Sequence, residues 1–377
     1  MLMTTDPAAD HRPTDRLRFG VEEEYLLVDP HTGRTVPRAP EVLERAEAEL
    51  GPRAQPEFLA TQIEACTPPV ETAAQLRAEL VAMRAAMARA AAPFGCVPVA
   101  CGTAVLPSRH PLPVTDQPRY HRIAELVGPV ADQTGAELCG CHVHLGDLDR
   151  ATALQLSAAL RPWLPVLQAL SSNSPFTEGS DLGLASGRWL FQRNWPTVGP
   201  APLLDLDGYE RTADALVARS RVLDRRMIYW YSRPSEHLPT LEVRVFDVNT
   251  DLDVTVLLAV LLRGLAWSLL AAPTRPRRAP ALTSAHWYAA RSGLTGEAVD
   301  PLTGEHLPMA RLLAHLYARA LPGLAAHGDR AAAEDLIRRV LCLGTGAARQ
   351  RAARANGKGL AGVVAHLATG FSESGSA

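Results

Sequence analysis

Pairs of chemically active side chains recur in four segments of the sequence. In three of them the two residues stand two positions apart, the spacing that places side chains on one face of a β-strand. In the fourth, two glutamates stand seven positions apart at the two ends of one segment. The pairs are Glu22 and Glu24, His142 and His144, Glu242 and Arg244, and the more widely spaced Glu57 and Glu64.

Carboxylates gathered in one cavity repel one another and become protonated unless cations neutralise them. A hard divalent metal ion is the simplest such cation. Carboxylate oxygens together with an imidazole, with no need for thiolates, suit Mg²⁺ or Mn²⁺ better than a structural zinc ion. The four pairs therefore predict a glutamate-rich metal site.

Each motif also has a purely structural explanation. Three glutamates in a row, as at 22–24, are typical of a solvated strand edge, and a His-x-His pair is often part of a hydrogen-bonded core. The cysteines and histidines of 139–144 are too crowded to converge on one zinc ion. The occurrence of all four pairs in one chain favours the functional interpretation.

Other catalytic signatures are missing from the sequence. It has no G-x-S-x-G nucleophile motif, no P-loop and no G-x-G-x-x-G after a predicted strand. If a nucleotide binds, we expect it to be held by metal ions and arginines rather than by a glycine-rich loop.

The elements that must position these residues indicate an α+β fold. Period-two alternation predicts strands, and apolar residues at helical spacing predict helices. We expect one face of the sheet to pack helices and the other to line a polar cavity. Strands are predicted at 17–28, 57–66, 95–102, 137–145, 227–231 and 240–247, and helices at 40–50, 71–92, 120–130, 151–171, 209–223, 251–270 and 310–368. The helical segment 151–171 is interrupted by Pro162 and Pro165.

Composition excludes several classes of protein. The 377 residues are 47% hydrophobic and 21% charged, which is typical of a chain that buries a core. A net charge of −2 gives no basic field for nucleic acid. The apolar segment 254–270 is short for a membrane span and contains Arg263, so we expect a core helix and no membrane partner.

The ends of the chain and its cysteines give three further expectations. Residues 1–16 have no apolar run of the kind found in signal peptides and are predicted to be a disordered leader. Six irregularly spaced cysteines fit a reducing compartment, so a cytoplasmic location is expected. No linker divides 17–370, which we interpret as a single catalytic domain with a helical C-terminal part.

Five motifs, in order from Gly20 to about Gly293, together resemble the carboxylate–amine ligases of the type 2 glutamate–cysteine ligase family. The resemblance implies a catalytic domain like that of glutamine synthetase, with a curved, mostly antiparallel sheet and helices packed on one face. The motifs are GVEEEY at 20–25, CGCHVH at 139–144, NSPF at 173–176, RNWPT at 193–197 and PTLEVRVFDV at 239–248.

The resemblance also implies roles for individual residues. Arg244 and Glu242 would be catalytic. The metal ligands would be Glu22, Glu24, Glu57, Glu64, His142 and Glu242. The candidates for binding ATP or substrate are Arg244, Arg193, Arg188, His144, Asn173 and Arg291. This chain departs from the family at Glu57, where relatives carry aspartate, at His144, where distant ligases carry asparagine, and in the altered segment 232–237.

The implied reaction joins a carboxylate, the γ-carboxylate of glutamate, to cysteine or another amine through an acyl phosphate. ATP and Mg²⁺ or Mn²⁺ would be the cofactors, small-molecule acids and amines the partners, and a homo-oligomer the default assembly. Two alternatives remain open at this point. One is a metal-dependent hydrolase that needs no ATP, and the other is a ligase-like fold that only binds a metabolite.

Overall fold

The computed structural model describes residues 17–134, 137–273 and 279–374. The predicted leader, residues 1–16, lies outside the described residues. The fold is built around a seven-stranded sheet with the order β2-β3-β1-β5-β9-β8, to which β4 adds by pairing with β1. The strands are β1 (Phe19–Val28), β2 (Ala54–Pro56), β3 (Gln62–Cys66), β4 (Val97–Val99), β5 (Gly140–Gly146), β8 (Ser232–Pro234) and β9 (Thr240–Asp247).

The register of the sheet brings the predicted pairs side by side. All pairings between these strands are antiparallel. Glu22 on β1 stands opposite His142 on β5, and His144 stands opposite Glu242 on β9. Glu24 stands opposite Glu64 on β3. Because side chains alternate between the faces of a strand, these residues share one face of the sheet.

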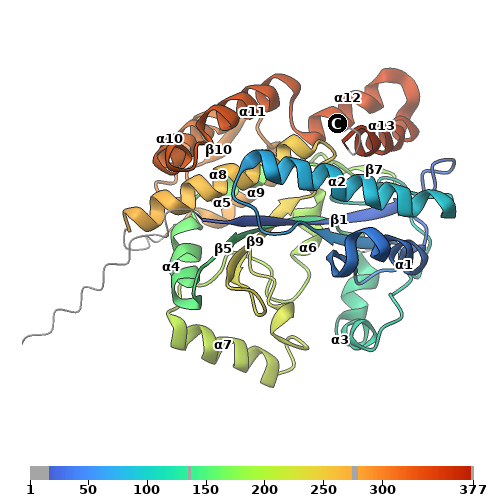
Figure 1. Cartoon of the computed structure of the whole chain (residues 1–377), viewed down its shortest axis with the longest axis horizontal. Coiled ribbons are helices and arrows are strands. Elements are labelled where there is room, and N and C mark those ends of the chain that lie inside the picture. Colours follow the sequence, from blue (N-terminus) through green and yellow to red (C-terminus); the bar gives the residue numbers. More distant parts are fainter. Residues whose placement is uncertain (1–16, 135–136, 274–278, 375–377) are drawn as a thin grey trace, which may run out of the picture.

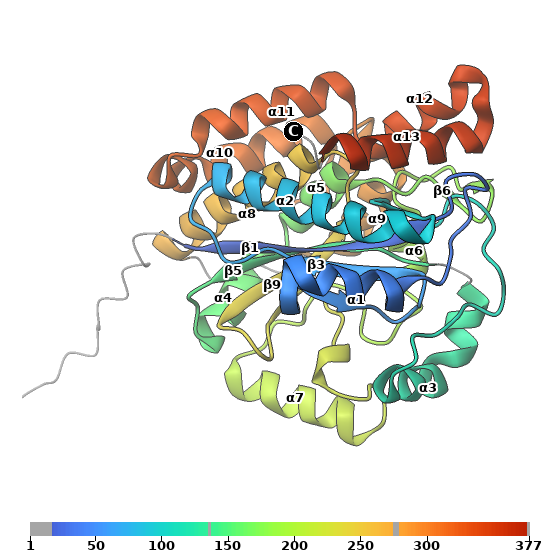
Figure 2. The same ribbon diagram turned by 45° about the vertical axis from the view of Figure 1, so that its right-hand side comes forward.

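The opposite face of the sheet carries the main core. Figures 1 and 2 show β1 running beneath α2 (Ala73–Ala91) and α8 (Leu252–Ala271), with the C-terminal helices above them. Helix α8 is apolar on all sides, and 83% of its most hydrophobic window is buried inside the protein. A helix with this pattern belongs in a core, which confirms the expected core helix. The outer helices are α10 (Met309–His327), α11 (Arg330–Leu343), α12 (Gly346–Ala353) and α13 (Gly359–Ser374).

Two helices lie on the polar side of the sheet. Helices α3 (Pro118–Thr134) and α7 (Leu206–Ala218) stand below the sheet in both views and contribute to two small hydrophobic clusters separate from the main core. The remaining α-helices are α1 (Ala39–Leu50), α4 (Arg150–Leu160), α5 (Leu164–Ser171), α6 (Gly187–Gln192) and α9 (Leu282–Ser292). Two short strand pairs lie outside the main sheet, β6 (Phe176–Thr177) with β7 (Ser180–Asp181) and β10 (Glu297–Val299) with β11 (His306–Pro308).

Two of the predicted strands are wrong. The segment 57–66 is not one strand, because β2 and β3 pair as an antiparallel hairpin and the chain must turn between them, at 57–61. The segment 227–231 also forms no strand. A short 3-10 helix at Arg225–Met227 precedes it, and the strand that pairs with β9 is β8, at Ser232–Pro234.

The predicted helix 151–171 is two helices, α4 and α5, separated at Pro162. Proline lacks the amide hydrogen that an α-helix needs, so a break there follows from the sequence. Taken together, the α+β class, the antiparallel sheet and the packing of the core helices on its apolar face are confirmed.

Candidate active site

The polar face of the sheet forms the floor of a cavity of about 670 Å³. All six predicted metal ligands line this cavity, although they come from four strands and a turn scattered over 220 residues of sequence. The ligands are Glu22, Glu24, Glu57, Glu64, His142 and Glu242. The cavity is also lined by His144, Arg188, Arg233 and Arg244.

His142 is the centre of two groups of potential metal ligands. It joins Glu22 and Glu242 in one group and Glu24 and Glu64 in the other, and within each group the ligand atoms lie within 4.8 Å of one another. Its Nδ1 lies 3.2 Å from Oε2 of Glu22, and its Nε2 lies 3.6 Å from Oε1 of Glu24. The imidazole therefore stands between two clusters of carboxylates.

The titration of His142 suits a ligand. Burial, together with the nearby Arg244, lowers its pKa to about 4, so the imidazole is neutral near pH 7. A neutral imidazole has a free lone pair for a metal ion. Hard carboxylate oxygens with one neutral imidazole are a donor set that fits Mg²⁺ or Mn²⁺.

The carboxylates carry more negative charge than their protein partners neutralise. Burial and then Glu24 raise the pKa of Glu57 to about 7. Burial, followed by the repulsion of Glu22 and Glu57, raises the pKa of Glu64 well above its ordinary value. Among the described residues, no hydrogen bond or ion pair reaches the carboxylate of Glu64. A cation between these acids would remove the repulsion, so the residues fit a divalent metal ion.

Glu22 differs from the other acids because two histidines surround it. Burial alone would raise its pKa, but His144 and His142 hold that pKa well below its ordinary value. The Nε2 of His144 lies 3.2 Å from Oε1 of Glu22, and its Nδ1 lies 2.9 Å from the hydroxyl of Thr240. His144 thus contacts the group of cavity acids through Glu22.

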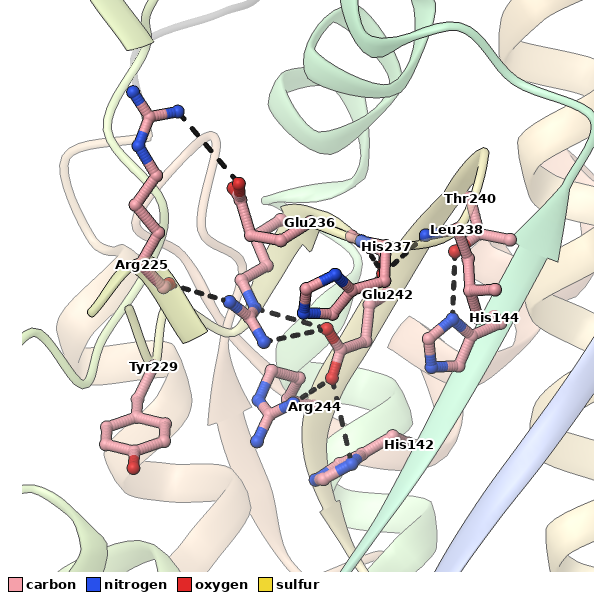
Figure 3. A network of polar contacts seen from close by, with 12 residues as sticks. His142, His144, Arg225, Tyr229, Glu236, His237, Leu238, Thr240, Glu242 and Arg244 are labelled. Carbon is pink, nitrogen blue, oxygen red and sulfur yellow. Dashed lines mark hydrogen bonds and ion pairs between the residues drawn. The ribbon is translucent and has the colours of Figure 1, made fainter. Parts of the chain in front are cut away.

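At the other end of the cluster, two arginines hold the carboxylate of Glu242. Figure 3 shows Glu242 between the guanidinium groups and His142. Arg233 lies 3.1 Å from Oε2 through both Nε and Nη2, and Arg244 pairs with Oε1. Burial and then Arg233 lower the pKa of Arg244 to about 10, so it stays charged at pH 7.

Arg188 on α6 is a buried cation whose guanidinium has few hydrogen-bond partners among the described residues. Its side chain lines the cavity and is 3% exposed. Within the described part of the chain, Nε and Nη1 have no hydrogen-bond partner, and Nη2 lies 3.5 Å from the carbonyl oxygen of Arg244. A buried guanidinium with free donors is costly unless an anion binds to it.

Three of the predicted binding residues do not line the cavity. Arg193 is exposed and its guanidinium stacks on Trp189, 4.8 Å from the ring centroid. Arg291 is exposed at the end of α9. Asn173 is fully buried, and its amide donates hydrogen bonds to the carbonyl oxygens of Ala100 (2.9 Å) and Val248 (2.8 Å). The placement of these side chains corrects the prediction for all three.

Several charged residues of the cavity, Arg233 among them, and an aromatic wall were not among the predicted site residues. Arg233 is only 6% exposed and pairs with Glu242, and the altered segment 232–237 was the signal that could have pointed to it. Four aromatic residues line the cavity in edge-to-face contact, with ring centroids 5.4 to 6.2 Å apart. They are Phe58, Tyr120, Trp195 and Tyr229.

Comparison with known proteins shows the family to which the chain is related. The family model described as glutamate-cysteine ligase family 2 matches residues 18–366. The chain belongs to this family. The protein named "Putative glutamate--cysteine ligase 2" in Salinispora tropica is 42% identical over 373 residues, which cover 97% of this chain and 98% of that protein. The protein named "Putative glutamate--cysteine ligase 2-1" in Nocardia farcinica is 41% identical, over 94% of this chain and 93% of that protein.

Solved structures show the same fold at low sequence identity. The glutamate–cysteine ligase of Francisella tularensis, solved with AMP, aligns with a TM-score of 0.74 at 13% identity, over 96% of this chain and 89% of that one. The bifunctional glutathione synthetase of Pasteurella multocida aligns with a TM-score of 0.73 at 16% identity, over 96% and 53% of the two chains.

Family membership confirms the resemblance that the motifs predicted. As a member of glutamate–cysteine ligase family 2, the chain is an ATP-dependent ligase that forms amide bonds. In the described structure, acids, histidines and arginines meet in the cavity over the polar face of the sheet.

Proposed function

We propose that this enzyme joins the γ-carboxylate of glutamate to cysteine or another amine, at the expense of ATP. The observation that carries the proposal is that two groups of glutamates, which have His142 in common, lie in one cavity. The buried arginines Arg188 and Arg244 line the same cavity. Acids that fit a divalent metal ion and buried arginines side by side suit a reaction in which phosphoryl groups and carboxylates meet.

Glu22, Glu24, Glu57, Glu64, His142 and Glu242 would hold Mg²⁺ or Mn²⁺. When bound, the ions supply charge neutralisation for the phosphates of ATP. In the chain itself, His144 keeps Glu22 ionised, and Arg233 fixes one oxygen of Glu242. These two residues set the geometry of the ligands and do not need to contact the substrate.

The first chemical step is phosphoryl transfer. An oxygen of the substrate carboxylate attacks the γ-phosphorus of ATP, the bond to the bridging oxygen breaks, and ADP leaves with that electron pair. Arg244, which lines the cavity, would clamp the transferring group, because a planar guanidinium binds two phosphate oxygens at once. The product of this step is an acyl phosphate.

In the second step the neutral amine attacks the acyl carbon. The carbon–oxygen bond to phosphate breaks, phosphate leaves with the electron pair, and the nitrogen loses a proton to give the amide. Arg188, with its unpaired donors, would bind a carboxylate of the acid substrate and hold it still through both steps.

The experiment that tests the proposal measures ADP and phosphate released by the purified enzyme with ATP and Mg²⁺. Glutamate is offered with a panel of amines, cysteine among them, and products are identified by mass. We expect release that requires both substrates and a product lighter than their sum by one water. Glu242→Gln should abolish release while the circular dichroism spectrum is unchanged. Hydrolysis of an amide or ester without ATP would overturn the proposal.

A further inference from the structure

Asp247, the last residue of β9, is a buried acid outside the cavity. It is 1% exposed and is not among the residues that line the cavity. Its carboxylate accepts three hydrogen bonds, from the backbone amide of Asn173 (2.9 Å), the hydroxyl of Ser174 (2.7 Å) and the hydroxyl of Ser186 (2.9 Å). A carboxylate fully engaged in this way fixes the groups that donate to it.

Each of the two serines that donate to Asp247 also accepts a hydrogen bond from a backbone amide in the first turn of α6. The hydroxyl of Ser174 accepts the backbone amide of Arg188 at 3.0 Å, and the hydroxyl of Ser186 accepts that of Trp189 at 3.3 Å. Ser186 is the N-cap of α6, which supplies a partner for an amide that the helix cannot satisfy itself. Both serines are 1% exposed, so water does not replace these bonds.

Helix α6 needs this support because it is only six residues long. Isolated helices of this length do not form in water, so the position of each residue in α6 depends on its caps and its packing. Arg188 is the second residue of that helix, and the direction of its side chain follows from where its backbone amide is held.

The guanidinium of Arg188 lies directly over Gly140, at the start of β5. A Cβ atom at Gly140 would collide with Nη2 and Cζ of Arg188. The arginine therefore fits one narrow place between β5 and the carbonyl oxygen of Arg244. With Nε and Nη1 unpaired, a small displacement would remove these donors from the cavity.

We propose that Asp247 is a positioning residue: through Ser174 and Ser186 it holds Arg188 in place to receive a carboxylate of the acid substrate. The inference rests on the proposed function for the identity of that substrate. The arrangement also ties β9, which carries Glu242 and Arg244, to the helix that carries Arg188. The carboxylate of Asp247 thus sets the distance between Arg244, which would bind the phosphoryl group, and Arg188, which would bind the substrate carboxylate.

The test compares three variants by steady-state kinetics with glutamate and ATP varied separately. Asp247→Ala should raise the KM for glutamate about 10-fold or more and leave the KM for ATP within about 2-fold. Gly140→Ala, whose new Cβ atom would collide with the guanidinium of Arg188 and leaves the carboxylate of Asp247 in the chain, should give the same pattern. In the double variant the two effects should be far from multiplicative, because both act on one side chain.

Two controls separate positioning from a general loss of stability. Asp329→Ala removes another buried acid, which pairs with Arg263 and does not line the cavity. It should lower the melting temperature and leave both KM values unchanged. Asp247→Asn keeps an oxygen for Asn173 and Ser174 and an amide for Ser186, so its KM for glutamate should stay within about 3-fold of wild type.

Several outcomes would overturn the inference. They are a folded Asp247→Ala enzyme with the wild-type KM for glutamate, an equal rise in both KM values, or an Asp247→Asn variant as impaired as the alanine variant. If the wild type releases no ADP with glutamate, the proposed function fails separately. Hydrogen exchange at the amides of Arg188 and Trp189 then decides the connection to Asp247: faster exchange in Asp247→Ala supports it, and unchanged exchange refutes it.

Discussion

At the scale of single residues, the cavity is a place where like charges are held close together. Glu57 and Glu64 have raised pKa values because burial and neighbouring carboxylates both oppose their ionisation. Glu22 has a lowered pKa because two histidines oppose the burial effect. The same acid side chain thus titrates in opposite directions within one site, and the direction depends on its neighbours.

Removal of one repelling acid should stabilise the metal-free protein. We expect Glu64→Gln to raise its free energy of unfolding by on the order of 1 kcal/mol, because a charge that burial and three glutamates disfavour is gone. The same change should weaken Mg²⁺ binding about 10-fold or more. Thermal unfolding with and without Mg²⁺ measures both effects. Glu49→Gln, at an exposed glutamate, is the control, and a metal-free Glu64→Gln protein less stable than wild type would contradict the prediction.

The pH dependence of stability should reveal Glu57. Its pKa in the folded protein, about 7, lies above its ordinary value of 4.5, so the folded state binds more protons than the unfolded state between these values. The stability that protonated Glu57 contributes is present below about pH 4.5 and is lost as the pH rises through 7. We expect the free energy of unfolding of the metal-free protein to fall by on the order of 2–3 kcal/mol over this range because of Glu57.

His142 acts in the opposite sense below pH 6.5, because its pKa is lowered to about 4. The measurement is therefore the difference in unfolding free energy between wild type and Glu57→Gln from pH 4.5 to 8. That difference should change steadily in favour of the variant as the pH rises. A difference that is flat across this range would show that Glu57 does not titrate there.

At the scale of elements, β1 separates two kinds of buried charge. Glu22 and Glu24 face the cavity, whereas Glu23 faces the helices and is fully buried. Arg84 on α2 binds both oxygens of Glu23 at 2.7 and 2.9 Å and also donates to the carbonyl oxygen of Thr250 at 2.7 Å. This pair fixes α2 on the sheet and leaves the cavity acids on the other face.

Breaking this pair should be costly. We expect Arg84→Met to lower the free energy of unfolding by about 3–5 kcal/mol, because Glu23 would stay buried without a cation. The matched control is Arg89→Met on the same helix, where the lost ion pair with Glu49 is exposed and is worth less than about 1 kcal/mol. Urea unfolding of both variants compares them, and equal losses would contradict the distinction between the two sites.

At the scale of the whole molecule, the C-terminal helices contribute side chains to the main core. Helix α10 crosses α8 where Gly323 meets the backbone of Gly264, and a Cβ atom at Gly323 would collide with the carbonyl oxygen of Gly264. We propose on this basis that 17–370 folds as one domain, because the helical C-terminal part shares its closest contact with the central core helix.

Gly323→Ala tests this proposal. It should force the two helices apart and lower the free energy of unfolding by about 3 kcal/mol or more. If the chain is one cooperative unit, tryptophan fluorescence and far-ultraviolet circular dichroism should shift together in a single transition. Gly128→Ala, in a helix where the new Cβ atom meets open space, is the control. Two separate transitions, with only one shifted, would contradict a single domain.

The sequence by itself determined which residues share a face and what chemistry they serve. A period of two places Glu22 with Glu24, His142 with His144 and Glu242 with Arg244, and the register of the sheet joined these pairs as expected. This information is local, because alternation in a strand follows from backbone geometry alone.

Only the tertiary structure decided what depends on distant parts of the chain. The β2–β3 hairpin brings Glu57 over the sheet from a turn, and Arg233 reaches Glu242 from a neighbouring strand. Asn173 is drawn into the core by carbonyl groups 73 and 75 residues away in sequence, whereas Arg193 stacks on Trp189 outside the cavity. Side chains of one type are sorted between site, core and surface by packing, and packing is set by contacts that sequence spacing does not encode.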